Sequence, residues 1–239
     1  MTLDWPPMSR VSERARPIWL GAAACAAGFI LVALVVASGI SDPVDAAIIS
    51  VVRAPGLHDA LSPLARITEL GSTWAVLVVG ALVLVLGWLS GRPRDGAAGA
   101  LTIAIGSLIV EATKRLTQRM RPDFLDPVIQ AVGYSFPSGH TTNATVAYGV
   151  LGVLVARLPW PTAIRVAIDV VLGAIVFGVG LSRVWLGVHY PTDVLAGWLL
   201  GGAIVLTYAA LTLPAPPEPG EGAADADPAA QRSDRPAAG

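Results

Sequence analysis

The chain has 239 residues, of which 54% are hydrophobic and only 14% are charged, and its formal net charge at pH 7 is −1. A soluble domain normally carries about 25% charged residues, so this composition excludes an ordinary soluble protein and indicates an all-α, polytopic membrane protein. The near-zero charge argues against a nucleic-acid partner, which would bind a basic face. A single cysteine, Cys25, excludes a disulfide within the chain.

The first apolar run, from Ile18 to about Ile40, follows a polar segment, residues 1–17, that contains three arginines. Roughly 20 apolar residues cross a bilayer, and the run is longer than the core of a signal peptide, which has about 7–15 residues. We therefore expect a retained first transmembrane helix. The mixed stretch 41–70 follows, with an amphipathic surface helix expected over Val44–Val52 and a solvated loop histidine at His58.

Five further runs complete a predicted bundle of six transmembrane helices: residues 72–90, 96–110, 140–157, 162–181 and 192–213. Asp169 falls inside the fifth span. A carboxylate there is a functional candidate, but a place near a helix end or facing the bundle explains it, and we favour a structural role. Residues 214–239 are rich in Pro, Ala, Gly and acidic residues and are expected to be disordered. The predicted organisation is a cytoplasmic segment 1–17, a six-helix domain 18–213 and a cytoplasmic tail 214–239.

Six spans place both termini on one side of the membrane. Most basic residues outside the spans share that side, which the positive-inside rule makes cytoplasmic: Arg10, Arg14, Arg16, Arg92, Arg94, Arg157 and Arg165. Five cations after the third and fifth spans fall on the other side, namely Lys114, Arg115, Arg119, Arg121 and Arg183. An anion bound at the extracytoplasmic face would account for them.

Three polar islands interrupt the apolar pattern on that face. In the first, Lys114 and Arg121 are seven residues apart, so on a continuing helix they would share one face; a basic patch touching lipid headgroups is the alternative for this segment alone. In the second, Pro137 and Gly139 shape a turn before a helix whose N-terminal N–H groups and dipole favour an anion, although the same residues also suit a plain helix-capping turn.

The third island runs from Ser182 to Asp193 and contains Arg183 and His189. His189 and Asp193 are four residues apart, which lets a carboxylate hold one imidazole nitrogen while the other nitrogen faces a reactant. Pro191 between them suits the first turn of a helix. We therefore expect His189 just outside a helix start and Asp193 in its first turn.

Lys-x6-Arg-Pro from Lys114, Pro-Ser-Gly-His from Pro137 and Ser-Arg-x5-His-x3-Asp from Ser182 together resemble the type 2 phosphatidic acid phosphatase (PAP2) family, whose site is shared with vanadium haloperoxidases. The resemblance spans Lys114 to Asp193. It implies a six-helix PAP2 bundle and a phosphate cradle formed by Lys114, Arg121, Ser138, Gly139 and Arg183.

The catalytic roles implied by this resemblance fall on three residues. His189 would attack phosphorus and form a phosphohistidine, with Asp193 fixing its tautomer, as the acid of a triad does. His140 would protonate the leaving oxygen and then activate water. Arg115 and Arg119 lie outside the fixed positions of the pattern and are assigned either to the surroundings of the site or to lipid contacts.

Phosphoryl transfer needs positively charged groups next to the equatorial oxygens of the phosphoryl group. The three islands supply it with fixed cations, and their sequences contain no cluster of carboxylates that would hold a metal ion. We therefore expect catalysis without a metal or other cofactor. His189 must start neutral and His140 charged, which predicts a bell-shaped pH–rate profile.

A site at the outer boundary of the plasma membrane meets lipids whose phosphates reach the headgroup layer, where Trp74, Trp160, Trp185 and Tyr190 are placed to anchor the protein. The expected activity is a lipid phosphate or diphosphate phosphatase, with undecaprenyl diphosphate as the first substrate candidate. Phosphatidylglycerophosphate, phosphatidate and decaprenyl-linked sugar phosphates are alternatives, and an anion or lipid transporter is the alternative from another class. Oligomeric state stays open.

Overall fold

The structure is a computed structural model that describes residues 8–54, 64–122 and 132–213. Every regular element in these ranges is helical. The elements are α1 (Met8–Ala37), α2 (Asp42–Val52), α3 (Leu64–Thr68), the 3-10 turn η2 (Glu69–Gly71), α4 (Thr73–Leu89), α5 (Pro93–Thr117), α6 (Gly139–Val155), α7 (Thr162–Trp185) and α8 (Pro191–Leu211). His58 and the proposed tail, residues 214–239, lie outside the described residues.

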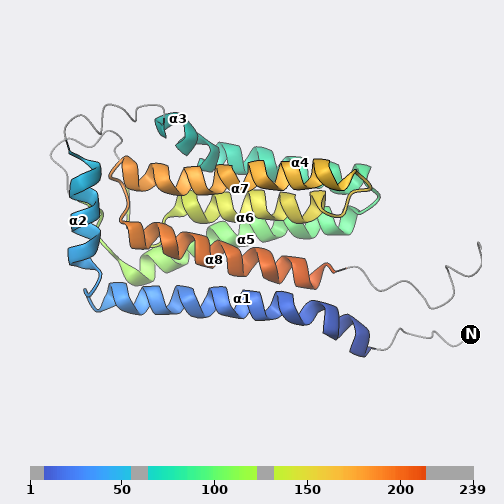
Figure 1. Cartoon of the computed structure of the whole chain (residues 1–239), viewed down its shortest axis with the longest axis horizontal. Coiled ribbons are helices and arrows are strands. Elements are labelled where there is room, and N and C mark those ends of the chain that lie inside the picture. The colour runs from blue at the N-terminus through green and yellow to red at the C-terminus, as the bar shows by residue number, and fades with distance from the viewer. Residues whose placement is uncertain (1–7, 55–63, 123–131, 214–239) are drawn as a thin grey trace, which may run out of the picture.

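In the part of the chain that the structure describes, six long helices run side by side, and the short helix α2 crosses one end of the bundle (Figure 1). Helix α6 is the central helix: it packs against α4, α5, α7 and α8. Ten of its seventeen residues are buried, most of them Val, Leu, Ala and Thr. The six-helix bundle predicted from the apolar runs is therefore the observed architecture.

The outer faces of the bundle are apolar. Large aliphatic and aromatic side chains are exposed along α1, α4 and α7, including Leu34, Val78 and Val170. A helix that faces water carries polar residues there, whereas lipid requires apolar ones. Within the described ranges, four helices are long and apolar enough to span a bilayer: α1 from Glu13 onward, α5, α7 and α8. Helix α4 is apolar and has seventeen residues, at the lower limit for a span.

Helix α1 begins ten residues earlier than expected. The prediction started it at Ile18, after Pro17, but the helix begins at Met8 and Pro17 lies within it. The residues before the proline include Glu, Arg and Ala, which are good helix formers. The ten helical residues that precede the first apolar run, almost three turns, therefore extend the helix beyond the predicted membrane boundary.

Glycines let α6 and α8 approach closely. A Cβ atom added to Gly197 would lie 2.9 Å from Cβ of Thr141, and one added to Gly201 would lie 2.5 Å from Cβ of Thr145. Two glycines four residues apart lie on one face of a helix, and small residues at this spacing allow close helix contacts in membranes. The consequence is that the N-terminal ends of α6 and α8 meet.

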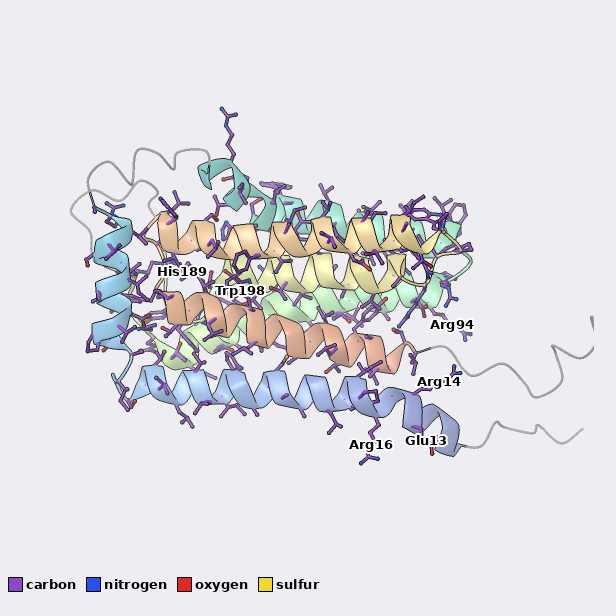
Figure 2. The ribbon with its side chains drawn as sticks, viewed as in Figure 1. Glu13, Arg14, Arg16, Arg94, His189 and Trp198 are labelled. Atoms are coloured by element: carbon purple, nitrogen blue, oxygen red, sulfur yellow. The ribbon has the colours of Figure 1, made fainter. Side chains whose placement is uncertain are left out.

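Cations gather at both ends of the bundle. His189 lies at the end crossed by α2, whereas Arg14, Arg16 and Arg94 lie at the other end (Figure 2). Arg157 belongs to that second end because it bonds to Asp95, with Nη1 3.3 Å from Oδ2. The predicted separation of the cations into two sets thus matches the ends of the bundle.

One predicted anchor is on the wrong side. Trp160 lies between α6 and α7, and α6 starts at the His189 end and rises about 1.5 Å per residue away from it. Trp160 is therefore at the end of Arg157, far from the headgroup layer to which Trp74 was assigned.

Candidate functional site

The link between α7 and α8, residues 186–190, carries His189. The carbonyl of Arg183 accepts hydrogen bonds from the N–H groups of Val188, at 3.2 Å, and His189, at 3.3 Å, which folds the link back on the end of α7. Gly187 has a φ of +66°, a conformation that glycine adopts without steric cost. Helix α8 then begins at Pro191 with Asp193 in its first turn, as the spacing predicted.

The two ring nitrogens of His189 face different partners. Nδ1 lies 3.4 Å from Oδ2 of Asp193 and 3.3 Å from Oγ of Ser135. Nε2 lies 3.1 Å from Nη1 of Arg121. A carboxylate next to Nδ1 favours the tautomer with its proton there, and the lone pair of Nε2 then points toward Arg121.

The imidazole of His189 is almost completely buried, with 1% of its side chain exposed. Burial lowers the pKa of His189 to about 3, although Asp193 opposes the shift, and the positive charges of Arg183 and Arg121 add to it. At neutral pH the imidazole is therefore neutral, the state in which a histidine is a nucleophile.

Asp193 is fully buried and is held from several directions. Its Oδ2 accepts hydrogen bonds from the backbone N–H of Tyr190, at 2.9 Å, and from the hydroxyl of Ser135. Its Oδ1 accepts from Nη1 of Arg119 at 2.7 Å. A buried carboxylate is stable only when its oxygens are paired in this way. These bonds fix the orientation of the carboxylate relative to His189.

Lys114 and Arg121 meet at the site, but not on one helix face. Helix α5 ends at Thr117, and Gln118 adopts a left-handed conformation with a φ of +48°. Arg121 precedes Pro122, and a residue before proline avoids the helical conformation. The prediction of a continuing helix was therefore wrong. The chain turns back, and Nη1 of Arg121 donates to the carbonyl of Val188 at 2.8 Å.

Arg183 is buried at the end of α7. Its Nη1 donates to Oγ1 of Thr68 at 2.7 Å, and its Nε is buried without a hydrogen bond to any described residue. A buried guanidinium donor without a partner is costly. Such a donor suits an anionic ligand that enters the site.

The Pro-Ser-Gly-His motif is attached directly to the start of α8. The N–H of Ser138 donates to the carbonyl of Asp193 at 3.0 Å, and the hydroxyl of Thr141 donates to Oγ of Ser138 at 2.9 Å. Gly139 faces Lys114: a Cβ atom at this position would lie 3.4 Å from Nζ of Lys114. The first turn of α6 is therefore next to the cations.

His140 follows in the same turn and is partly exposed. It lies within electrostatic range of His189 and of three cations, Arg183, Lys114 and Arg121, and these cations disfavour a positive charge on its imidazole. The expectation that His140 starts charged is therefore not met before an anion binds. Every residue that the sequence assigned to the site thus lies at one end of the bundle. These residues come from α5, α6, α7 and α8, from the described residues between α5 and α6, and from the link between α7 and α8.

Four side chains at the site were not assigned to it from the sequence, or were assigned only loosely: Asp45, Thr68, Arg119 and Ser135. Ser135 stands two residues before Pro137, and this closeness to a motif was its only signal. The sequence allowed two roles for Arg119, either in the surroundings of the site or in a lipid contact. Its bonds to Asp193 and its exposure of 11% support the first alternative. Arg115, by contrast, is 75% exposed and pairs with Glu111.

The arrangement suits transfer of a phosphoryl group. A neutral imidazole held by a carboxylate is a nucleophile, the cations match phosphoryl oxygens, and a second imidazole is placed to move a proton. In such reactions positioning and electrostatic stabilisation of the phosphoryl oxygens supply most of the catalysis.

Comparisons with known proteins point the same way. The model of the PAP2 superfamily matches residues 96–214, which contain all three motifs. Phosphatidylglycerophosphatase B of Bacillus subtilis is 34% identical over 154 residues, which cover 63% of this chain and 72% of that protein. Undecaprenyl-diphosphatase of Sulfolobus acidocaldarius is 30% identical over 143 residues, covering 58% of this chain and 64% of that protein.

A solved structure is also similar. The crystal structure of a transmembrane PAP2-type phosphatidylglycerolphosphate phosphatase from Bacillus subtilis superposes with a TM-score of 0.68 at 28% identity. The superposition covers 79% of this chain and 94% of that one.

Proposed function

We propose a mechanism and a substrate class for this chain, which belongs to the PAP2 superfamily and is a multi-pass membrane phosphatase. Its substrate carries a phosphate or diphosphate on a membrane lipid. The observation that carries the mechanism is the two-sided environment of His189, with Nδ1 toward Asp193 and Nε2 toward Arg121.

In the first step the terminal phosphate of the lipid binds among Lys114, Arg121 and Arg183, with Ser138 and the N–H of Gly139 completing the cradle. Arg121 exchanges its contact with Nε2 for one with a phosphoryl oxygen. Nε2 of His189 attacks phosphorus, so that a P–N bond forms as the P–O bond to the lipid breaks.

The negative charge of the bound phosphate offsets the neighbouring cations, so that His140 takes up a proton when the substrate binds. The leaving oxygen then takes this proton from His140, and Asp193 stabilises the positive charge that develops on His189. In the second step neutral His140 removes a proton from water, the hydroxide attacks phosphorus and the P–N bond breaks. Inorganic phosphate leaves, and both histidines return to their initial states.

The fixed cations supply the charge that phosphoryl transfer requires, so the proposed reaction needs no metal. We place the site on the extracytoplasmic face and both termini in the cytoplasm. Arg14, Arg16 and Arg94 lie at the end opposite His189 (Figure 2). This supports the orientation, because positive residues outside spans favour the cytoplasm.

Two substrates are favoured within the lipid class. Undecaprenyl diphosphate is the first candidate from the sequence, and the relative from Sulfolobus acidocaldarius, named for that activity, supports it. Phosphatidylglycerophosphate is the second, supported by the Bacillus subtilis protein of 34% identity. The shared motifs bind phosphate and leave the tail and the rest of the headgroup to other surfaces of the bundle.

The test is phosphate release by the purified protein in detergent micelles, from both lipids and phosphatidate, with a chelator present. We expect release from at least one lipid at the same rate with and without chelator, and loss of release in His189→Ala. Acid-labile, base-stable phosphate on the protein during turnover would mark the phosphohistidine. Release that requires added magnesium, or that persists in His189→Ala, would refute the mechanism.

A further inference from the structure

Arg119 is a buried guanidinium outside the positions that the three motifs fix. Its Nη1 donates to Oδ1 of Asp193 at 2.7 Å and to Oγ1 of Thr192 at 2.8 Å. Its Nη2 donates to Oδ2 of Asp45 at 2.8 Å and to Oδ1 of Asp42 at 3.2 Å. One planar fork therefore joins helix α2 to the first turn of α8.

Asp45 is the second anchor of this fork. Its side chain is 1% exposed, although it sits on the short helix α2 at the edge of the molecule. Its Oδ1 accepts a hydrogen bond from the N–H of Thr192 at 3.2 Å, and its Oδ2 accepts one from the hydroxyl of the same residue. Asp45 thus holds both Arg119 and the backbone beside Asp193.

The charges of the network are kept in place by their mutual contacts. Burial opposes the charge of Arg119, but Asp193 and Asp45 outweigh it and raise the pKa of the guanidinium above its usual value. The guanidinium also lies over the ring of Tyr190, 4.3 Å from its centroid, a favourable cation–π position. Arg119 is therefore a fixed cation between two buried carboxylates.

The two oxygens of Asp193 have separate tasks. Oδ2 faces Nδ1 of His189, and Oδ1 is bound by Arg119. Rotation of the carboxylate would break both contacts at once. A planar fork holds an acceptor in direction as well as in distance, which an ammonium group does not.

We propose that Arg119 is a positioning residue for catalysis: it fixes the carboxylate of Asp193 against His189, and Asp45 of helix α2 fixes Arg119. Helix α2, which no motif covers, is then part of the catalytic apparatus. This inference rests on the proposed role of His189. Arg119 itself does not touch the substrate and acts through Asp193.

The test compares Arg119→Lys and Asp45→Asn with the wild type in the phosphate-release assay. Arg119→Lys keeps the charge and loses the fork, whereas Asp45→Asn keeps the shape and loses the charge that holds Arg119. A misplacement of about 1 Å at a reacting group costs up to about 100-fold in rate. We expect kcat to fall by about 100-fold in Arg119→Lys and about 10-fold in Asp45→Asn, with KM within about threefold of the wild type.

The matched control is Arg115→Lys, because Arg115 lies on the same basic segment but is exposed and bound only to Glu111 in the described part of the chain. We expect its kcat within about twofold of the wild type. Thermal unfolding and size-exclusion chromatography verify that each variant folds. If Arg119→Lys does not fold, the kcat and KM of Asp45→Asn test the same inference.

A double-variant series separates positioning from a general structural role. In the background of Asp193→Asn, Arg119→Lys should reduce kcat by less than about threefold, because the group through which it acts is already altered. The inference is overturned if Arg119→Lys still lowers kcat by about 100-fold in the Asp193→Asn background. It is also overturned if the single variant Arg119→Lys has the same kcat as the control Arg115→Lys. If wild-type release itself does not depend on His189, the proposed function fails instead.

Discussion

Replacing Asp193 with asparagine tests the centre of the proposed site. Asparagine keeps the shape of the side chain but changes one acceptor oxygen into an NH2 donor. Both oxygens of Asp193 face donors: Arg119 on one side, and Tyr190 N–H and Ser135 on the other. In either orientation the new amide therefore places a donor against a donor.

The size of the effect follows from these contacts. An amide that offers its oxygen to Arg119 turns its NH2 toward His189, and the imidazole must then accept at Nδ1 and carry its proton on Nε2. The nucleophilic lone pair is lost in that tautomer, and an equivalent change in a Ser-His-Asp triad lowers kcat about 10⁴-fold, or about 5.4 kcal/mol. The folded state should lose about 3 kcal/mol, the lower end for a broken buried ion pair, because Arg119 keeps its bond to Asp45.

The assay is phosphate release at saturating lipid, with kcat and KM measured for purified wild type and Asp193→Asn. Asp169→Asn is the matched control. Asp169 has an oxygen that is buried without a hydrogen bond to any described residue, and it lies beside Gly152, away from His189. We expect the control to keep kcat within about threefold of the wild type. A folded Asp193→Asn enzyme with kcat within tenfold of the wild type would refute the assigned role of the carboxylate.

Three further predictions concern other parts of the molecule. The pKa of His189 is lowered from 6.5 to about 3 in the folded state, so between these pH values the unfolded chain binds one more proton than the folded chain. The free energy of unfolding should therefore be highest above pH 6.5 and fall toward pH 3 by up to about 1.4 kcal/mol per pH unit. Thermal unfolding measured over this range should show a smaller decline for His189→Gln than for the wild type. Gly201→Ala places a methyl group against α6 and should lower the free energy of unfolding by about 1–3 kcal/mol and remove most of the activity. The control Gly80→Ala meets open space and should leave the stability unchanged or raise it. Equal melting temperatures of the two variants would contradict this packing. Thr68→Val removes the bond that holds Arg183 and should raise KM about tenfold, the effect of losing about 1.4 kcal/mol of hydrogen bonding; an unchanged KM would show that Arg183 is held by other contacts.

Much of the fold was predictable because its signals are local. The apolar runs predicted the six long helices of the described ranges. Pro191 and Gly139 indicated the starts of α8 and α6 to within a residue or two. The spacing of His189 and Asp193 gave their contact, because both lie within one link and one helical turn. In each case the determining interactions connect residues close together in the chain.

The surroundings of the site were not predictable in the same way. Asp45 contacts a helix that begins almost 150 residues later, and nothing in its own neighbourhood distinguishes it from an acidic residue in the first turn of a helix, which the helix dipole alone favours. Thr68 likewise holds Arg183 across 115 residues of sequence. The helix predicted through Arg121 failed for the opposite reason, because the left-handed Gln118 ended it within the local sequence.

The short connection between α7 and α8 has a consequence for how this enzyme can diversify. The twelve residues from Ser182 to Asp193, which include this connection, contain the proposed nucleophile, the acid proposed to orient it and one proposed phosphate ligand. Their side chains are held by polar groups inside the end of the bundle, among them Arg119, Ser135 and Thr68. Mutations on the lipid-facing sides of the bundle leave that unit unaltered. Under the proposed function, substitutions on those sides would change the fit of the lipid tail and leave the proposed reaction as it is.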